Sequence, residues 1–376
     1  MAATRRYWWQ GIDVWTLLPA CLLTCFGLSS MYSFDVRFIF FERQIIWFSI
    51  ALGVFLLLQH VRYRFLRATK PVLVIYSGVI FLLVLTLILG SVFKGARSWI
   101  DVGLFAIQPT ELAKVALIIL LAKYFSRRHI EIAHIRHVLV SGMYAGLLFF
   151  LVMLQPDFGS ALIIGFIWFG MILSSGISWK HVGGLVALGA VSLSLLWVFV
   201  FADYQKERIL TFINPARDLK GAGYNAQQSV IAVGSGELVG KGIGYGTQSK
   251  LRFLPEHQTD FIFAAFAEEW GFVGVSIIFL LFAILIGRLH FYAWRGESTF
   301  ESLVVIGFVA MIVGAFIINV GMNLGIMPVT GVALPFMSYG GSHLLAEYAL
   351  LGVVTGMYHY ARTAHADDID REMFDA

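Results

Sequence analysis

Ionisable side chains inside apolar stretches are the feature of this 376-residue chain that could do chemistry. Glu111 and Lys114 lie three residues apart in one apolar run, Asp157 lies at the junction of two others, and Asp260 comes just before a fourth. Ionisable groups are costly in lipid and therefore indicate functional sites. A carboxylate at a membrane–water boundary could act as a general base, and a nearby cation could stabilise an anionic leaving group.

Each of these residues also has a structural interpretation. Glu111 and Lys114 share a helix face, so they could form an ion pair within a helix bundle or line a polar cavity. Asp157 precedes Gly159 and Ser160 and could cap a helix. Asp260 could likewise be the N-cap of the helix that follows it. Spacing alone leaves these alternatives open.

The composition limits the class of protein. Hydrophobic residues make up 59% of the chain and charged residues 13%, against about 25% charged residues in soluble domains. This excludes a soluble globular enzyme and indicates a chain surrounded by membrane lipids. The net charge of +4 is too small to suggest a nucleic-acid partner. Cys21 and Cys25 share one face of the first apolar run and are expected to be apolar packing residues.

The apolar runs predict an all-α polytopic membrane protein. Ten runs occur, at about 14–33, 44–60, 71–92, 106–125, 138–155, 158–178, 182–202, 261–287, 302–326 and 344–361. At about 20 residues per span they occupy about 200 residues, which the chain length accommodates. We expect a single membrane domain over residues 1–376.

The basic residues predict the orientation. With the N-terminus in the cytoplasm, fifteen Lys and Arg residues fall in inner segments and four in the short outer loops. Both termini are therefore expected in the cytoplasm, with the first run retained as a membrane helix. The acidic tail at 362–376 is expected to be a solvated, mobile end. His129, His134 and His137 are expected to belong to a basic surface that meets anionic headgroups.

One long extracytoplasmic loop, at about 203–260, separates the seventh and eighth predicted helices. Residues 225–233 predict an amphipathic helix, which could serve as a lid or lie at the outer leaflet. Gly240–Lys241 does not make a phosphate-binding loop, since that motif needs Gly at 235 and Ser or Thr at 242.

Further polar residues surround the predicted outer end. Asn319 and Asn323 are expected to form hydrogen bonds between helices, and 327–342 is expected to be an irregular re-entrant segment. At most one of Glu268 and Glu269 can readily face the same cavity as Asp260. The outer basic residues could clamp a pyrophosphate together with Lys114. They are Lys94, Arg97, Lys206, Arg208, Arg217 and Lys220.

These motifs resemble the SEDS family of polytopic peptidoglycan glycosyltransferases, which includes RodA and FtsW. The matching stretches are 94–101 (KGARSWID), 108–114 (QPTELAK), 155–160 (QPDFGS), 246–249 (GTQS), 259–264 (TDFIFA), 334–335 (LP) and 338–342 (SYGGS). They occur in family order over nearly the whole chain. The GTQS stretch and the short cytoplasmic ends are more similar to RodA than to FtsW.

The resemblance implies polymerisation of lipid II into glycan strands at the outer face of the cytoplasmic membrane, during cell elongation and shape maintenance. Asp260 matches the family's catalytic aspartate and Asp157 its second outer carboxylate. Glu111 and Lys114 match its fourth-span pair, and Arg208 a basic position near the substrate groove.

The resemblance also implies partners and a cofactor. A class B penicillin-binding protein is expected as partner, beside other elongation-complex membrane proteins. A divalent cation, Mg²⁺ or Mn²⁺ with unknown ligands, is expected to assist the reaction. No organic cofactor is expected. A lipid II flippase or a division-type, FtsW-like polymerase are the alternative functions.

Overall fold

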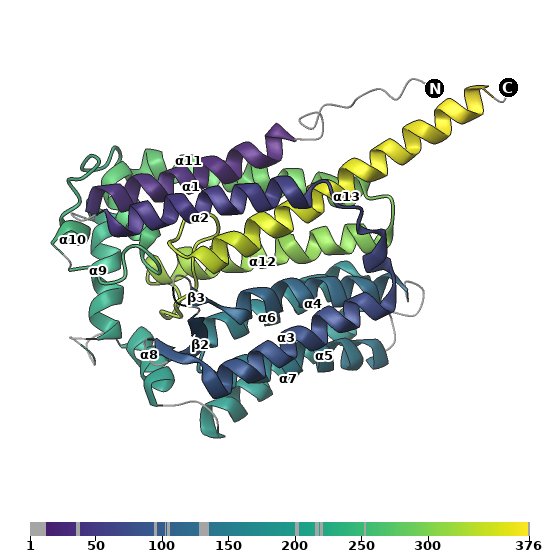
Figure 1. Ribbon diagram of the computed structural model, residues 1–376. Coiled ribbons are helices and arrows are strands. Elements are labelled where there is room, and N and C mark those ends of the chain that lie inside the picture. The colour runs from purple at the N-terminus through teal and green to yellow at the C-terminus, as the bar shows by residue number, and fades with distance from the viewer. Residues whose placement is uncertain are drawn as a thin grey trace.

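The computed structural model describes residues 13–34, 38–93, 96–101, 103, 106–127, 135–199, 203–214, 218, 221–251 and 253–374. Within them, ten long helices form a bundle (Figure 1). They are α1 (Val14–Phe34), α2 (Ile39–Leu58), α3 (Thr69–Leu89), α4 (Pro109–Ser126), α5 (Ile135–Leu154), α6 (Phe158–Ser174), α7 (Trp179–Phe199), α11 (Ile262–Arg295), α12 (Thr299–Asn323) and α13 (Gly341–Phe374). Each lies on one of the ten predicted spans, so the predicted all-α polytopic architecture is confirmed.

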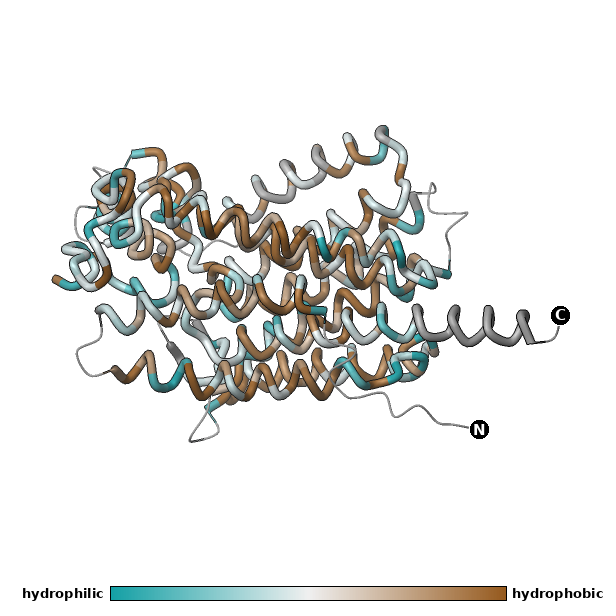
Figure 2. The backbone as a smooth tube through the Cα atoms, turned by 90° about the horizontal axis from the view of Figure 1, so that it is seen from above, coloured by the Kyte–Doolittle hydropathy of each residue, from teal (hydrophilic) through white to brown (hydrophobic). Residues whose placement is uncertain are grey.

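The helices bury a hydrophobic core that includes several polar side chains, and they also expose many large apolar side chains. In the described part of the chain, six helices are long and apolar enough to cross a membrane: α1, α2, α3, α5, α11 and α12. Apolar residues run along the bundle, and hydrophilic residues gather at its two ends (Figure 2). α12 packs against α4, α6 and α11 and forms the centre of the core. α4 carries Glu111, Lys114 and Lys123, and all three side chains are buried within the bundle.

Small elements collect at the end of the bundle opposite the two chain termini (Figure 1). They are the antiparallel sheet β1 (Ser91–Phe93), β2 (Ala96–Asp101) and β3 (Ala106–Ile107), and the helices α8 (Asp203–Ile213), α9 (Ala222–Ser235) and α10 (Thr247–Lys250). α9 contains the predicted amphipathic segment 225–233. The sheet was not predicted, because its strands are only two to six residues long.

Backbone groups of the long loop replace hydrogen bonds that α11 loses at a kink. Gly271 has φ 65° and kinks the helix, so backbone groups on both sides lose their helical partners. Residues 237–242 supply replacements: Phe272 N donates to the Glu237 carbonyl, and Lys241 N to the Glu268 carbonyl, at 2.9 and 3.0 Å. The approach is so close that a Cβ on Gly271 would lie 2.2 Å from Gly240 N. Glycine is therefore required at the kink, and the predicted single span at 261–287 is a bent helix that continues to Arg295.

The acidic segment at 362–376 continues α13, whose helical backbone reaches Phe374 and extends beyond the bundle (Figure 1). Its mobility stays a prediction. Its sequence after residue 361 contains Ala, Arg, Glu and Met, which favour helix.

Candidate active site

Asp260 lies in the turn that leads into α11. The N-cap of this helix is Phe261, so the alternative in which Asp260 caps the helix is wrong. The Asp260 carbonyl accepts hydrogen bonds from Asn319 Nδ2 and Asn323 Nδ2, both at 3.0 Å. The main chain of Asp260 is thus fixed by two buried amides of α12, while its side chain is half-buried.

A non-helical segment, 324–340, packs against this turn and forms one wall of the site. Ser338 Oγ donates to the Thr259 carbonyl at 2.7 Å, and Tyr339 N to the Gln258 carbonyl at 2.8 Å. A Cβ on Gly331 would lie 3.6 Å from Asp260 Oδ2, so the carboxylate lies beside this glycine. The segment is irregular, as predicted, and much of it is buried in protein. Non-helical backbone at membrane depth must be buried in this way or face water, because lipid offers no hydrogen-bond partners.

The predicted interhelix role of the two asparagines is confirmed. Asn319 Nδ2 also donates to the Val332 carbonyl at 2.7 Å, and Asn323 Oδ1 accepts from Ala264 N at 3.1 Å. Ser229 of α9 donates to the Asn323 carbonyl at 2.9 Å. The amides therefore join α9, α11, α12 and the irregular segment around Asp260.

Asp157 lies on the other side of the irregular segment. It is the N-cap of α6: Oδ1 accepts from Ser160 N at 3.0 Å, which confirms the cap interpretation. Its second oxygen accepts from Gln108 Nε2, at the start of α4, at 3.2 Å. A Cβ on Gly159 would lie 2.9 Å from the Thr330 carbonyl, so this cap packs directly against the residue before Gly331.

Glu111 and Lys114 form the predicted ion pair. Lys114 Nζ lies 2.7 Å from each carboxylate oxygen of Glu111, and both side chains are buried. The pair continues into α13, where His343 Nδ1 lies 3.3 Å from Glu111 Oε2 and His343 Nε2 lies 2.9 Å from Glu347 Oε1.

Sequence reasoning missed His343 and Glu347. Glu347 lies within the apolar run predicted at 344–361, so the criterion that selected Glu111 would have selected it too. His343 lies one residue before that run. Their contact with α4 is tertiary and has no signal in the sequence.

Glu268 and Glu269 face the long loop. Glu268 Oε1 accepts from Lys241 Nζ and Thr247 N, both at 2.8 Å. Glu269 Oε1 accepts from Ser33 Oγ at 2.6 Å and Gly244 N at 2.9 Å. Both carboxylates therefore anchor the loop near the start of α11.

The predicted outer cations lie on separate elements. Arg97 is exposed on β2, and Arg208 is half-buried on α8, both at the same end of the molecule as Asp260 (Figure 1). Lys94 lies outside the described residues. The predicted pyrophosphate clamp stays a prediction.

No preformed metal cage is found. Among the described residues, no three His, Cys, Asp or Glu side chains converge as metal ligands. Of the histidines in the predicted basic surface, only His137 lies in the described part, and its Nδ1 is 2.9 Å from Tyr124 Oη. The described residues therefore offer no cage that would hold a cation by protein ligands alone.

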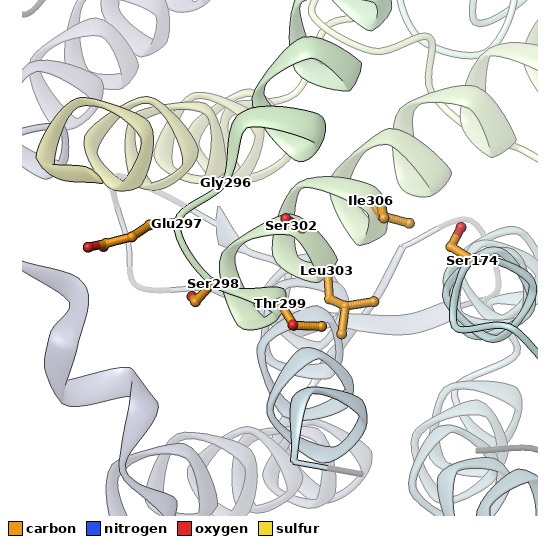
Figure 3. Close-up of a pocket in the computed structure, with 8 residues that line it drawn as sticks. All are labelled: Ser174, Gly296, Glu297, Ser298, Thr299, Ser302, Leu303 and Ile306. Atoms are coloured by element: carbon orange, nitrogen blue, oxygen red, sulfur yellow. The ribbon is translucent and has the colours of Figure 1, made fainter. Parts of the chain in front are cut away.

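A hollow of about 380 Å³ lies at the opposite end of the bundle, where α11 joins α12. Hydroxyl side chains line it, among them Ser174, Ser298 and Ser302 (Figure 3). Asp260 precedes the other end of the 34-residue α11, about 50 Å away at 1.5 Å per residue. This hollow is therefore separate from the site around Asp260.

The fold and the site define a multi-pass membrane protein with ionisable and amide side chains gathered at one end of its bundle. The chain belongs to the FtsW/RodA/SpoVE family, described as "Cell cycle protein", whose match covers residues 8–363. It is 36% identical over 321 residues to "Peptidoglycan glycosyltransferase MrdB" of Escherichia coli strain K12, covering 85% of this chain and 86% of the relative.

Two solved structures are similar. One is a chain of the structure described as "Structural coordination of polymerization and crosslinking by a peptidoglycan synthase complex", with a TM-score of 0.81 and 31% identity. The match covers 93% of this chain and 98% of that one. The other is the rod shape determining protein RodA of Thermus thermophilus, with a TM-score of 0.71 and 29% identity over 93% of this chain and 97% of that one.

Proposed function

We propose that this protein is a peptidoglycan glycosyltransferase that polymerises lipid II into glycan strands at the outer face of the cytoplasmic membrane. The name of the MrdB relative and the membership of the family support this activity. The observation that carries the proposal is the setting of Asp260: its backbone carbonyl is held by Asn319 and Asn323, and its carboxylate lies beside the irregular segment, at the same end of the bundle as the loop elements.

The reaction proposed for Asp260 is general-base catalysis of an inverting glycosyl transfer. Its carboxylate takes the proton from the acceptor sugar hydroxyl while that oxygen attacks the anomeric carbon of the lipid-linked donor. A new carbon–oxygen bond forms as the bond to the pyrophosphate breaks. The bonding electrons leave with the pyrophosphate as an anion, so the leaving side needs no acid.

Cations are proposed to stabilise this anion. Lys114 is held in place by Glu111, and Arg97 and Arg208 occupy the outer elements. Arginine suits pyrophosphate because its guanidinium makes bidentate contacts. A divalent cation stays part of the proposal, since Mg²⁺ is commonly bound through one or two carboxylates plus substrate phosphates and needs no dedicated cage.

The test is polymerisation of labelled lipid II by purified protein. We expect Asp260→Asn, which preserves size, to lower the rate by about 10²–10⁴-fold, as for the loss of a general base. Glu237→Gln, at an exposed carboxylate of the same loop, is the matched control and should retain the rate. Lys114→Ala should also lower the rate. Unchanged polymerisation by Asp260→Asn would overturn the assignment. Lipid II transfer across vesicles without strand formation would indicate the flippase instead.

The proposed cellular role is elongation and maintenance of cell shape, with both termini in the cytoplasm. The similarity to the rod shape determining protein RodA supports the role in cell shape. A class B penicillin-binding protein is the proposed partner for crosslinking, beside other elongation-complex membrane proteins. The similar chain from a complex that coordinates polymerisation with crosslinking supports that partner. Copurification with elongation-type rather than division-type transpeptidases from the same cells would test this role.

A further inference from the structure

A buried chain of four ionisable side chains joins α4 to α13. It runs from Lys114 to Glu111, then to His343 and Glu347. The histidine side chain is 11% exposed, and the other three are between 1% and 6% exposed. The charged groups that the structure places against His343 are Glu111 from α4 and Glu347 from its own helix. On α2, the uncharged Trp47 packs against Gly341, two residues earlier.

The geometry defines the protonation of His343. Its Nδ1 is hydrogen-bonded to Glu111 Oε2 at 3.3 Å, and its Nε2 lies 2.9 Å from Glu347 Oε1 in an ion-pair contact whose angle does not make a hydrogen bond. A neutral imidazole has one N–H, so one nitrogen lone pair would face a carboxylate. Both carboxylates are already acceptors, Glu111 from Lys114 and Glu347 from Phe336 N at 2.7 Å. An imidazolium is attracted to both carboxylates and gives the four side chains two positive and two negative charges.

The series of four buried side chains ends at the irregular segment 324–340, which forms one wall of the site. Glu347 Oε2 binds the backbone of Phe336, whose φ of 61° is in the left-handed region that non-glycine residues rarely adopt. Two residues later, Ser338 Oγ accepts from Leu334 N at 2.8 Å and donates to the Thr259 carbonyl at 2.7 Å. Thr259 precedes Asp260. A continuous set of polar contacts thus leads from the buried ion pair to the backbone of the proposed base.

We propose that His343 is a positioning residue for the glycosyl transfer: as an imidazolium clamped between Glu111 and Glu347, it holds the turn at 334–338 and so the backbone that presents Asp260. This inference rests on the proposed function. His343 does not contact the reacting atoms and acts through Glu347 and the irregular segment. Loss of its proton leaves a lone pair against a carboxylate and an excess negative charge in the bundle, which loosens the turn.

The experiment compares His343→Gln, Glu347→Gln and the double variant with the wild type. Each single change unbalances the charges, and the double change restores balance with Lys114 and Glu111. A glutamine at 347 also retains an acceptor for Phe336 N. His290→Gln, at an exposed histidine near the other end of α11, is the matched control. The readouts are kcat and KM for labelled lipid II between about pH 6 and pH 9.5, a range that covers histidine titration, and amide exchange of residues 334–339.

We expect His343→Gln to lower kcat about tenfold or more at neutral pH, with KM changed about twofold or less, because misplacement of a catalytic group costs rate. The wild type should lose kcat at alkaline pH, and Glu347→Gln should shift that loss to lower pH. The double variant should recover most of kcat and show no such step. Exchange of 334–339 should rise in His343→Gln and fall again in the double variant.

Wild-type kcat, pH profile and exchange in His343→Gln would overturn the inference. The inference would also be overturned if the reductions in kcat of the two single variants simply multiplied in the double variant. A purely structural packing role predicts this result, because restoring the charge balance would then not restore kcat. If His343→Gln does not fold, the pH shift of Glu347→Gln and the recovery of the double variant decide the question. The exchange readout is independent of polymerisation. A wild type that makes no glycan would therefore contradict the proposed function. The amide exchange of residues 334–339 would still test whether His343 holds this turn.

Discussion

The chemistry proposed for Asp260 depends on where α11 begins. The first helical residue is Ile262 and the N-cap position is Phe261, so Asp260 lies in the turn two residues before the helix. Asp157, by contrast, uses one oxygen to cap α6. Two carboxylates that look equivalent in sequence therefore differ in position: one caps a helix, and the other, the proposed base, lies in the turn before one.

At the same scale, we predict that the amide of Asn319 supports catalysis by Asp260. Asn319→Leu leaves the Val332 carbonyl without this donor, at a cost of about 1–3 kcal/mol, and leaves the Asp260 carbonyl with Asn323 as its side-chain donor. We expect a lower unfolding midpoint and a kcat reduced about tenfold or more, because the base is displaced. Kinetics with labelled lipid II and thermal unfolding in detergent measure both. Asn225→Leu, on α9, is the control, and wild-type kcat in Asn319→Leu would contradict the prediction.

A second prediction concerns Asp13, one residue before α1. Burial raises the pKa of this carboxyl, but hydrogen bonds from Arg288 and Tyr292 outweigh burial and hold the pKa below its ordinary value. The stability it contributes is therefore full above the unfolded-state pKa of about 3.9 and is lost as pH falls through the lower folded-state pKa.

The substitution Asp13→Asn should lower the free energy of unfolding by about 1–3 kcal/mol at neutral pH, from the loss of hydrogen bonds to a charged group. The difference from wild type should shrink as pH falls below the unfolded-state pKa of about 3.9 toward the lower folded-state pKa. Unfolding midpoints in detergent over this pH range measure it, with the exposed Glu42→Gln as control. A difference that stays constant with pH would exclude the ionised carboxylate as its source.

At the scale of elements, the long loop is fixed to α11 by side chains as well as by backbone. Glu268 accepts from Lys241 Nζ and from the amides of Thr247 and Gln248, at 2.8 to 3.1 Å. It thus satisfies free donors at the start of α10, a four-residue helix that could not be stable alone.

We predict that Glu268→Ala frees this part of the loop. Hydrogen bonds to charged groups contribute about 1.5–3 kcal/mol each, so exchange of the amides at 247 and 248 should rise at least about tenfold. Hydrogen exchange of the 241–251 peptide measures this. Glu301→Ala, which removes the partner of Arg67 at the other end of the bundle, is the control and should leave that peptide unchanged. Equal protection in both variants would show that the backbone contacts alone hold the loop.

The elements differ in how far they could be predicted. The ten spans follow from composition, because a helix that faces lipid must be apolar over its length. The kink at Gly271 was not predicted, since the loop backbone that stabilises it comes from thirty residues earlier in the chain. The site was only partly predicted, because it too depends on contacts between segments that are far apart in the sequence. Ionisable residues in apolar runs identified Glu111 and Lys114, but their contact with His343 depends on how α13 packs against α4.

At the scale of the whole molecule, the proposed function requires that Asp260 and the long loop face outward. The structure places the loop elements at one end of the bundle and the chain termini at the other (Figure 1), and the basic residues predict which end is cytoplasmic. In a background with Cys21 and Cys25 replaced by alanine, we expect Glu237→Cys to react with a membrane-impermeant maleimide in intact spheroplasts. Arg127→Cys, exposed at the end of α4, should react only after permeabilisation. The opposite labelling pattern would place the carboxylate in the cytoplasm, where an outer-face polymerase could not use it.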